Sequence, residues 1–324
     1  MAAETGLSVA TVSRALNDAP NVKPETRDLV RAAALRIGYM PNPAAKALST
    51  QRTRTIAAVV PTLAHSIFAK FLNTIELELA AGGYGLVIAT SGGDPAIELK
   101  RAGEMLRLGA EGLIVSGAAH QDDLLSLIAQ RRTPTVCTSI YDPGAPLPTI
   151  GYDNRALAGM AVAHLQSLGH HHIAVVHGPA GQNDRTALRL AGARAAAEPE
   201  TRIETVETSL DVAGGAGAMR MLAGRGGQAT AILCLSDVLA LGVGFELNRQ
   251  GVIIPDDVSV MGFDDLDWAE HAAPALTTIG LPVVEMGRRT AAAMIACLDE
   301  GIEITSQRLD AGLIARASTA PPRR

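Results

Sequence analysis

From Thr55 onward, short apolar runs alternate with longer amphipathic segments, and this alternation constrains the fold more than any other feature. Runs such as 56–61 and 112–115 have the length of buried strands, and the segments between them repeat apolar residues at helical spacing. Strands joined by helices form right-handed βαβ units, in which helices cover both faces of a parallel sheet. The sequence therefore predicts an α/β body.

The alternation runs through two halves of similar length, which predicts two doubly wound lobes. We predict strands over residues 56–61, 84–90, 112–115, 135–138, 173–177, 203–207, 230–235 and 258–262, and helices over 66–81, 95–108, 121–131, 155–168, 185–197, 214–224 and 237–250. Ligands of such sheets bind at the carboxyl ends of the strands. We therefore expect polar site residues on loops 61–68, 138–142, 178–186, 235–237 and 262–268.

The beginning of the chain has the pattern of a helix-turn-helix, a DNA-binding motif. Gly6 suits a tight turn, and Ser8 can cap a helix over residues 9–17 by accepting a hydrogen bond from a backbone N–H group. The first turn of such a helix faces base edges in the major groove. Val12 and Leu16 are predicted to form its buried side.

A third helix is predicted to follow and to support the first two. Pro24 suits its first position, because proline lacks the N–H group that would be unpaired there. Leu29, Ala33 and Ile37 would form its apolar stripe, and Gly38 would end it.

The charge of the chain is divided unevenly. Residues 1–54 contain eight Lys or Arg and four Asp or Glu, a net charge of +4, whereas the whole chain carries −5, so the remainder carries −9. A basic segment on an acidic body is expected when only that segment meets a polyanion.

A short helix over residues 43–49 can follow Asn42, which is a capping residue placed before a proline. Seven residues do not hold a helix alone in water, so this segment could be a linker that folds on DNA. Leu48 is then a candidate wedge for the minor groove. The alternative is a plain connector whose leucine packs on the next domain.

Several motifs occur in a fixed order through the chain. They are Ser8–Asn17, Tyr39–Leu48, Gly151–Asn154, Leu168–His170, Gly178–Pro179, Arg189–Gly192, Pro255–Asp265 and Pro274–Ile279. In this order and spacing they resemble the lac and galactose repressor family, the LacI/GalR-type transcriptional regulators, over nearly the whole chain.

The resemblance implies an all-α helix-turn-helix head with a hinge helix, followed by a two-lobed α/β body like the type I periplasmic sugar-binding proteins. We accordingly place the head at residues 1–48 with its hinge helix at 41–49, and an effector-binding and dimerisation domain at 55–320. The lobes would be about 55–153 with 282–305, and 154–281 with 306–318. The family further implies a homodimer, a palindromic double-stranded operator and a small effector between the lobes.

Carried over position by position, the resemblance assigns two sets of site residues. The DNA-binding set is Ser8, Val9, Ala10, Thr11, Ser13, Arg14, Asn17, Asn42, Ala45, Lys46 and Leu48. The effector-binding set is Ile67, Phe68, Ser139, Asn183, Asp184, Arg185, Arg189, Ser236 and Asp264.

Within these sets, the base-reading positions are Val9, Ala10 and Arg14, and the minor-groove leucine is Leu48. A guanidinium and a carboxylate that face each other across a cleft, as expected of Arg189 and Asp264, can hold a carboxylated or polyhydroxylated molecule. Phe68 would cover a ring. The alternative is an ion pair between Arg189 and Asp264 that only closes the lobes.

The chain also departs from the family pattern. Ser236 stands where many relatives have Asn, and Leu281 stands where a polar residue is frequent, so the pocket is expected to be drier. Arg185 adds a second cation and favours an acidic effector, so the predicted effector is a sugar or a sugar acid. Only Met1–Thr5 match the first DNA helix, which predicts either an upstream start codon or a ligand-binding protein that binds DNA weakly.

Other function classes lack their motifs in this sequence. No GxGxxG follows the first strand, no GxSxG occurs, and the run Gly214–Gly217 is interpreted as a surface loop, so we predict no enzyme and no cofactor. His170–His172 are interpreted as a solvated loop and not as a metal site, because consecutive side chains of a strand point in alternating directions.

The compartment is predicted from cysteines and from apolar runs. Cys137, Cys234 and Cys297 show no CxxC spacing, which suits a reducing cytosol and a place in the core. No signal peptide and no run long enough to span a bilayer occur. We therefore predict a cytoplasmic protein without a membrane partner.

Overall fold

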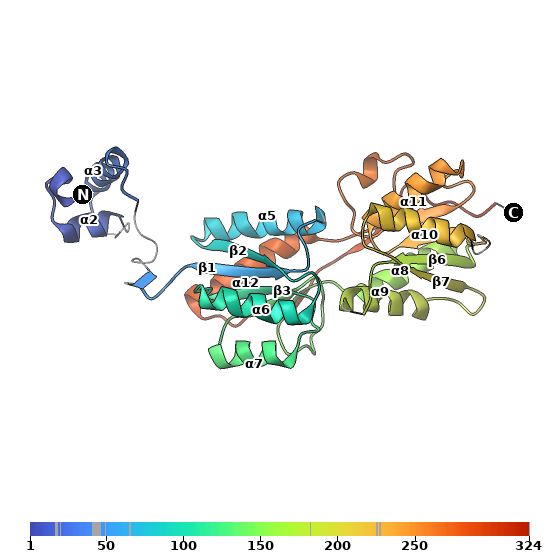
Figure 1. Cartoon of the computed structure of the whole chain (residues 1–324), viewed down its shortest axis with the longest axis horizontal. Helices are drawn as coiled ribbons and strands as arrows, with labels where there is room; N and C mark the ends of the chain where they lie inside the picture. The colour runs from blue at the N-terminus through green and yellow to red at the C-terminus, as the bar shows by residue number, and fades with distance from the viewer. Residues whose placement is uncertain are drawn as a thin grey trace. The chain divides into compact units, whose positions relative to one another are not determined.

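The computed structural model describes residues 1–16, 19, 21–40, 47–48, 50–64, 66–181, 183–224, 226 and 228–323. The chain divides into two compact units, Met1–Arg54 and Thr55–Arg324 (Figure 1). Most of the expected hinge helix over 41–49 falls outside the described residues, so it stays a prediction.

The first unit is a small helical domain. It contains α1 (Ala2–Thr5), α2 (Val9–Leu16) and α3 (Pro24–Arg36), and its buried apolar cluster consists of Val12, Ala15, Val22 and Val30. Gly6 ends α1 with a φ of 66°, the left-handed conformation that glycine adopts without strain. The predicted helix-turn-helix elements are therefore present.

Two details of this packing were predicted wrongly. Leu16 is only partly buried, since Ala15 occupies the inner side of α2 beside Val12. On α3, Leu29 and Ile37 are 46% and 47% exposed, whereas Val30 and Ala33 are fully buried. Ala33 is therefore buried as predicted, but Val30 and not Leu29 packs beside it, one residue further around the helix.

The first lobe of the second unit is built on a parallel sheet. Its strand order is β11-β5-β4-β3-β1-β2, with β1 (Thr55–Val60), β2 (Gly85–Thr90), β3 (Gly112–Ser116), β4 (Thr135–Thr138), β5 (Thr149–Gly151) and β11 (Gln307–Arg308). Alternate residues of β1 pack into two clusters. One cluster includes α5 (Ser66–Ala81) and α12 (Val283–Glu300), and the other includes α6 (Pro95–Arg107) and α7 (Asp122–Arg131), so helices cover both faces (Figure 1).

The second lobe repeats this plan with four parallel strands. The order is β7-β6-β8-β9, with β6 (His172–His177), β7 (Arg202–Glu207), β8 (Ala231–Cys234) and β9 (Ser259–Met261). α8 (Asn154–Ser167) and α9 (Asp184–Ala195) cover one face, and α10 (Val212–Gly224) and α11 (Asp237–Arg249) cover the other. A short antiparallel pair, β10 (Thr278–Gly280) and β12 (Gly312–Ile314), and a 3-10 turn, Ala269–His271, complete it.

The chain crosses between the lobes after β5, after β10 and after β11. The last crossing lies slightly later than expected. We predicted that residues 306–318 belong to the second lobe, but β11 pairs with β5 of the first sheet through Gln307 and Arg308. This two-residue strand is too short to give a periodic signal in the sequence.

The predicted helix over 214–224 is confirmed as α10, so the interpretation of its first residues, Gly214–Gly217, as a surface loop is wrong. A side chain on Gly215 would collide with the carbonyl oxygen of Leu239, and one on Gly242 would collide with that of Val212. The glycines therefore allow α10 and α11 to pack backbone against backbone.

Candidate functional site

A pocket of about 110 Å³ lies between the two lobes, at the carboxyl ends of their strands. Eight of the nine predicted effector residues line it: Ile67, Phe68, Ser139, Asn183, Arg185, Arg189, Ser236 and Asp264. The remaining one, Asp184, does not. Their role in binding stays a prediction, but the structure brings these eight side chains together.

Arg189 extends from α9 and is held from several directions. Its Nε donates to Asn154 Oδ1 at 2.9 Å, and its Nη1 donates to the carbonyl oxygen of Leu235 at 2.9 Å. The guanidinium also lies 3.9 Å from the centre of the Phe263 ring, a cation–π arrangement. Arg189 is therefore fixed before any ligand arrives.

Asp264 follows β9 and is the anionic group beside Arg189. Its Oδ1 lies 3.8 Å from Arg189 Nη1, and its Oδ2 accepts a 2.8 Å hydrogen bond from Ser236 Oγ. Both charged residues belong to the second lobe, so the expectation that they face each other across the cleft is wrong. For the same reason, their ion pair does not close the lobes.

The environment of Asp264 is strained and poorly solvated. Its φ is 131°, a region that residues with a side chain rarely adopt, and such strain is often kept at functional sites. Burial raises the pKa of its carboxyl group to about 7, against the opposing effect of Arg189, and the nearby Asp237 carboxyl raises this pKa further.

Asp237 holds the turn that carries Asp264. Its carboxylate accepts hydrogen bonds from Thr278 Oγ1 at 2.7 Å and from the N–H group of Leu266 at 2.8 Å. Gly262 makes room for it, because a side chain there would collide with Asp237 Oδ1. Burial raises the pKa of Asp237 as well. Apart from the position of Asp237 beside Ser236, no sequence feature indicated this role.

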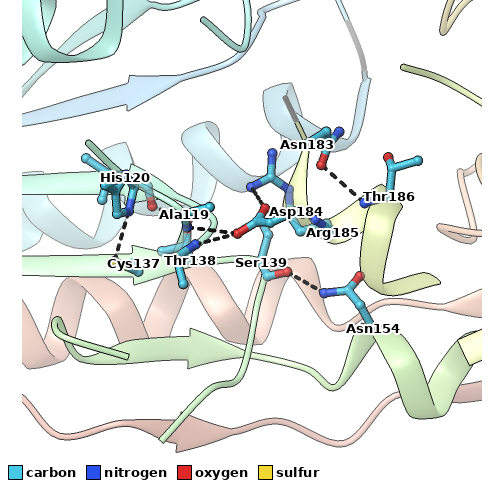
Figure 2. Close-up of polar contacts among 12 residues, drawn as sticks. Ala119, His120, Cys137, Thr138, Ser139, Asn154, Asn183, Asp184, Arg185 and Thr186 are labelled. Carbon is cyan, nitrogen blue, oxygen red and sulfur yellow. Dashed lines mark hydrogen bonds and ion pairs between the residues drawn. The ribbon is translucent and has the colours of Figure 1, made fainter. Parts of the chain in front are cut away.

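Ser139 and Asn154 join the first lobe to this network. Ser139 has a φ of 66°, its N–H group lies 3.2 Å from the sulfur of Met286, and its carbonyl oxygen accepts from Asn154 Nδ2 at 2.9 Å (Figure 2). Since Asn154 also accepts from Arg189, one amide links the loop after β4 to the guanidinium. Asn154 was part of a recognised motif, but we did not predict it as a site residue.

Apolar side chains complete the pocket, and most of them were not predicted. Besides Ile67 and Phe68, they are Phe71, Leu210, Leu235, Val238, Leu266, Val283 and Met286, together with the ring of Tyr152. Phe71 is three residues after Phe68 on α5, a spacing that could have indicated it. Leu281, expected to make the pocket drier, lies in the hydrophobic core and not in the pocket wall.

At the start of α9, Arg185 lines the pocket and is paired with its neighbour. Arg185 Nη1 donates to Asp184 Oδ1 at 2.9 Å, and Asn183 caps the helix by accepting from the N–H group of Thr186 at 3.3 Å (Figure 2). Asp184 therefore neutralises the second cation of the site without lining it.

In the head, the predicted recognition helix presents its expected side. Ser8 Oγ accepts from the N–H group of Thr11 at 3.1 Å, which confirms the predicted cap. Val9 is 75% exposed, and Ala10, Ser13 and Arg14 are exposed as well. Leu48 is 84% exposed. Four further members of the DNA-binding set, Asn17, Asn42, Ala45 and Lys46, lie outside the described residues.

Comparison with known proteins agrees with this geometry. Residues 1–42 match the family of bacterial regulatory proteins, lacI family, and residues 162–319 match the periplasmic binding protein-like domain. The chain is 32% identical to the HTH-type transcriptional repressor CytR of Escherichia coli K12, over 98% of this chain and 95% of that protein. The chain belongs to the LacI family. It is also 31% identical to the HTH-type transcriptional regulator GntR of Pseudomonas aeruginosa, over 98% and 94%.

Solved structures of LacI-family proteins share the fold over the full length. The lac repressor dimer bound to operator and the anti-inducer ONPF has a TM-score of 0.86 and 25% identity, over 98% of this chain and 97% of that chain. The complex of the transcriptional regulator CelR with cellobiose has a TM-score of 0.70 and 30% identity, over 98% of each chain. This LacI-family chain is therefore a DNA-binding transcriptional regulator, as the sequence predicted.

Other features of this LacI-family chain bear on the remaining predictions. No group of three or more His, Cys, Asp or Glu among the described residues could hold a metal ion. His170 is not in a solvated loop but buried, where its ring bonds to Thr230 Oγ1, Ser259 Oγ and the carbonyl oxygen of Ala320. Of the helices in the described part of the chain, none is long and apolar enough to cross a membrane.

Proposed function

We propose that this LacI-family regulator binds a palindromic operator through its head, with an affinity that changes when a small neutral sugar occupies the pocket. The observation that carries the effector class is the pocket wall, where the fixed guanidinium of Arg189 and the carboxyl group of Asp264 lie close together. The hydroxyls of a sugar ring can accept hydrogen bonds from Arg189 and donate them to Asp264, and the apolar face of the ring can pack on Phe68.

A neutral sugar fits better than a sugar acid. Each cation of the site has an acid beside it, since Arg185 is paired with Asp184 and Arg189 with Asp264. A carboxylated effector would have to displace one of these acids. Relatives with bound neutral sugars include CelR with cellobiose and a LacI-family regulator of Enterococcus faecium with ribose, 26% identical over 82% of this chain, 99% of that chain, with a TM-score of 0.71.

For the DNA contacts, we infer that Val9, Ala10 and Arg14 face base edges in the major groove. Their exposure at the first turns of a capped helix supports this, and Arg14 can reach a guanine edge or a phosphate. Exposed Leu48 is the candidate for the minor groove.

A homodimer would bring two heads to the two halves of a palindrome. The effector-binding unit carries exposed apolar side chains that suit such an interface. Val87 and Ile88 lie on β2, the edge strand of the first sheet, and Phe245 and Ile253 lie on and just after α11 of the second lobe. The exposure of β2 is explained by its place at the edge of the sheet.

The test of DNA reading is selection from a random double-stranded library, with the chain and with Arg14→Ala. Enrichment of a palindrome by the chain alone supports the proposal, and failure to enrich any motif would overturn it. For the effector, calorimetric titrations with ribose, cellobiose and gluconate compare neutral and acidic probes. Binding of gluconate only would overturn the neutral class.

Leu48→Ala tests whether Leu48 inserts into the minor groove of the selected operator. Loss of an apolar side chain that inserts between base pairs should weaken operator binding by about 1–3 kcal/mol, roughly 5- to 150-fold, and should leave effector binding unchanged. Fluorescence anisotropy of labelled operator measures the first quantity. Equal operator affinity would show that Leu48 is only part of a connector.

A further inference from the structure

Asp184 belongs to the second lobe, but its carboxylate is bound by the backbone of the first. Its Oδ2 accepts hydrogen bonds from the N–H groups of Ala118 at 2.7 Å and Ala119 at 3.1 Å, in the loop that follows β3 (Figure 2). Its Oδ1 accepts from Arg185 Nη1. Bonds from two N–H groups to an ionised acceptor are stronger than neutral ones, and here they join two lobes.

The loop of the first lobe is shaped for this contact. Gly117 has a φ of 85°, and a side chain on it would collide with Arg185 Nη1 and would lie 2.6 Å from Asp184 Oδ1. A side chain at position 117 would therefore displace the ends of the Arg185 and Asp184 side chains and would strain the backbone.

The far end of the same loop is anchored by a buried histidine. The His120 side chain is 2% exposed, and its Nδ1 lies 2.8 Å from Glu98 Oε2. Its Nε2 lies 3.4 Å from Cys137 Sγ (Figure 2). Gly117 donates its N–H group to the carbonyl oxygen of Thr138. The two N–H groups that meet Asp184 are thus presented by a loop fixed at both ends.

The two oxygens of Asp184 have different partners. Asn183 provides the side-chain cap of α9, and Asp184 is the first residue of that helix, where its Oδ1 accepts from the N–H group of Arg185 at 2.8 Å. Its Oδ2 accepts from the two N–H groups of the first lobe. Asp211, just before α10, offers a comparison, because it accepts from the N–H group of Gly214 in its own helix at 2.6 Å. The cross-lobe bonds of Asp184 are made in addition to its bond within α9.

We propose that Asp184 is a tether between the lobes, a positioning residue that holds the pocket closed and joins that closure to Arg185 in the pocket wall. The tether goes beyond the proposed function, because it acts before DNA or effector binds. A ligand atom that accepts a hydrogen bond from Arg185 competes with Asp184 Oδ1, so occupancy of the pocket changes the group that holds the lobes together.

The test is the distance between the lobes, measured by pulsed electron spin resonance without DNA or effector. Nitroxides are placed on Asp123→Cys of α7 and Arg194→Cys of α9, both exposed, in a Cys297→Ser background. Labelled chain is mixed with an excess of unlabelled chain, so that each distance lies within one subunit. This readout is independent of whether the chain reads DNA or takes a sugar.

We expect one narrow distance in the unsubstituted protein and a second, shifted population at least as large in Asp184→Ala and in Gly117→Ala, which break the tether from opposite lobes. Asp184→Asn keeps an oxygen for the two N–H groups but loses its charge, so it should show a smaller second population. Asp211→Ala, the matched control, should keep the single distance. Distributions of Asp184→Asn and Gly117→Ala that superimpose on that of the unsubstituted protein would overturn the proposal.

Discussion

The two walls of the pocket differ in chemistry and in how firmly they are held. The second lobe supplies Arg189 and Asp264, each fixed by hydrogen bonds or ring contacts within a buried network. The first lobe supplies mainly apolar side chains, among them Ile67 and Phe68, which are partly buried at the beginning of α5.

This difference assigns different tasks to the lobes. Polar groups must be held in place before binding if their hydrogen bonds are to add affinity, whereas an apolar cover needs only to exclude water. We therefore expect the second lobe to select the effector and the first lobe to cover it. The largest effects on effector binding should come from the second-lobe wall.

Arg189→Ala should have the largest effect of all. It removes the cation and leaves Asp264, the amide of Asn154 and the carbonyl oxygen of Leu235 without their partner. Removing one partner of a buried pair destabilises the fold by about 3–5 kcal/mol. Because the cation that would hold the effector is lost, the effector response should be abolished, while operator binding is retained. The measurement is operator release as a function of sugar concentration, and an unchanged dose response would show that the pocket is used differently. Arg189→Lys, which keeps the charge, serves if the alanine variant does not fold.

Asp264→Asn should change the pH dependence of binding. A hydroxyl of the effector donates to the ionised carboxylate, so affinity should fall as the pH drops below the raised pKa of about 7. Asparagine does not titrate, so the variant should bind weakly at every pH. Calorimetric titrations from pH 5.5 to 8.5 measure this, and a pH-dependent affinity in the variant would assign the titration to another group.

The pH dependence of folding stability provides a control for Asp264. Its contribution to stability should fall as the pH rises, whereas effector affinity should rise. The pKa of Asp264 is higher in the folded than in the unfolded protein, so its contribution to stability is complete below about pH 4 and is lost as the pH rises through 7. The loss has a slope of at most about 1.4 kcal/mol per pH unit. In urea unfolding, the free energy of unfolding of Asp264→Asn should therefore decrease less steeply with rising pH. The contribution of Asp237, whose pKa is also raised, should remain.

The contrast between local and long-range interactions explains which parts of the structure could be predicted from the sequence. The lobes follow from local periodicity, so the strands and helices between residues 55 and 262, apart from β5, were predicted within a few residues. The short strands β5, β10, β11 and β12 have no periodic signal, because they are defined by partners far away in the chain. The buried glycine face of α10 was not predicted for a related reason, because its partner is another helix, α11, and not a nearby stretch of sequence.

For the site, the residues of the pocket could be predicted but not their arrangement. The family resemblance pointed to Arg189 and Asp264, yet only the fold shows that both lie on one lobe. Asn154 and Asp237 act through hydrogen bonds to residues distant in sequence, which no motif spacing encodes. His170 looked like part of a polar loop because its buried partners lie sixty and more residues later.

Phe68→Ala tests whether the first lobe covers the effector without selecting it. It removes apolar area from the first-lobe wall without leaving a charge unpaired, so effector affinity should fall by about 1–2 kcal/mol, roughly 5- to 30-fold. The decrease should be the same at every pH, in contrast to that of Asp264→Asn. Titration of the sugar at two pH values measures both quantities, and a loss as large as that of Arg189→Ala would remove the division of tasks between the lobes.

Ser236→Ala and Ser66→Ala provide the finest comparison, since each deletes one hydroxyl from opposite walls of the same pocket. Ser236 donates to Asp264 Oδ2 at 2.8 Å, so its loss should weaken effector binding by about 1 kcal/mol, roughly fivefold, and should raise the pKa of Asp264. The pH at which affinity is half-maximal should therefore move upward in Ser236→Ala only. Ser66→Ala should remain within about 0.5 kcal/mol of the unsubstituted protein, as expected for a wall that covers without selecting. Equal losses in the two variants would mean that selection is shared between the lobes.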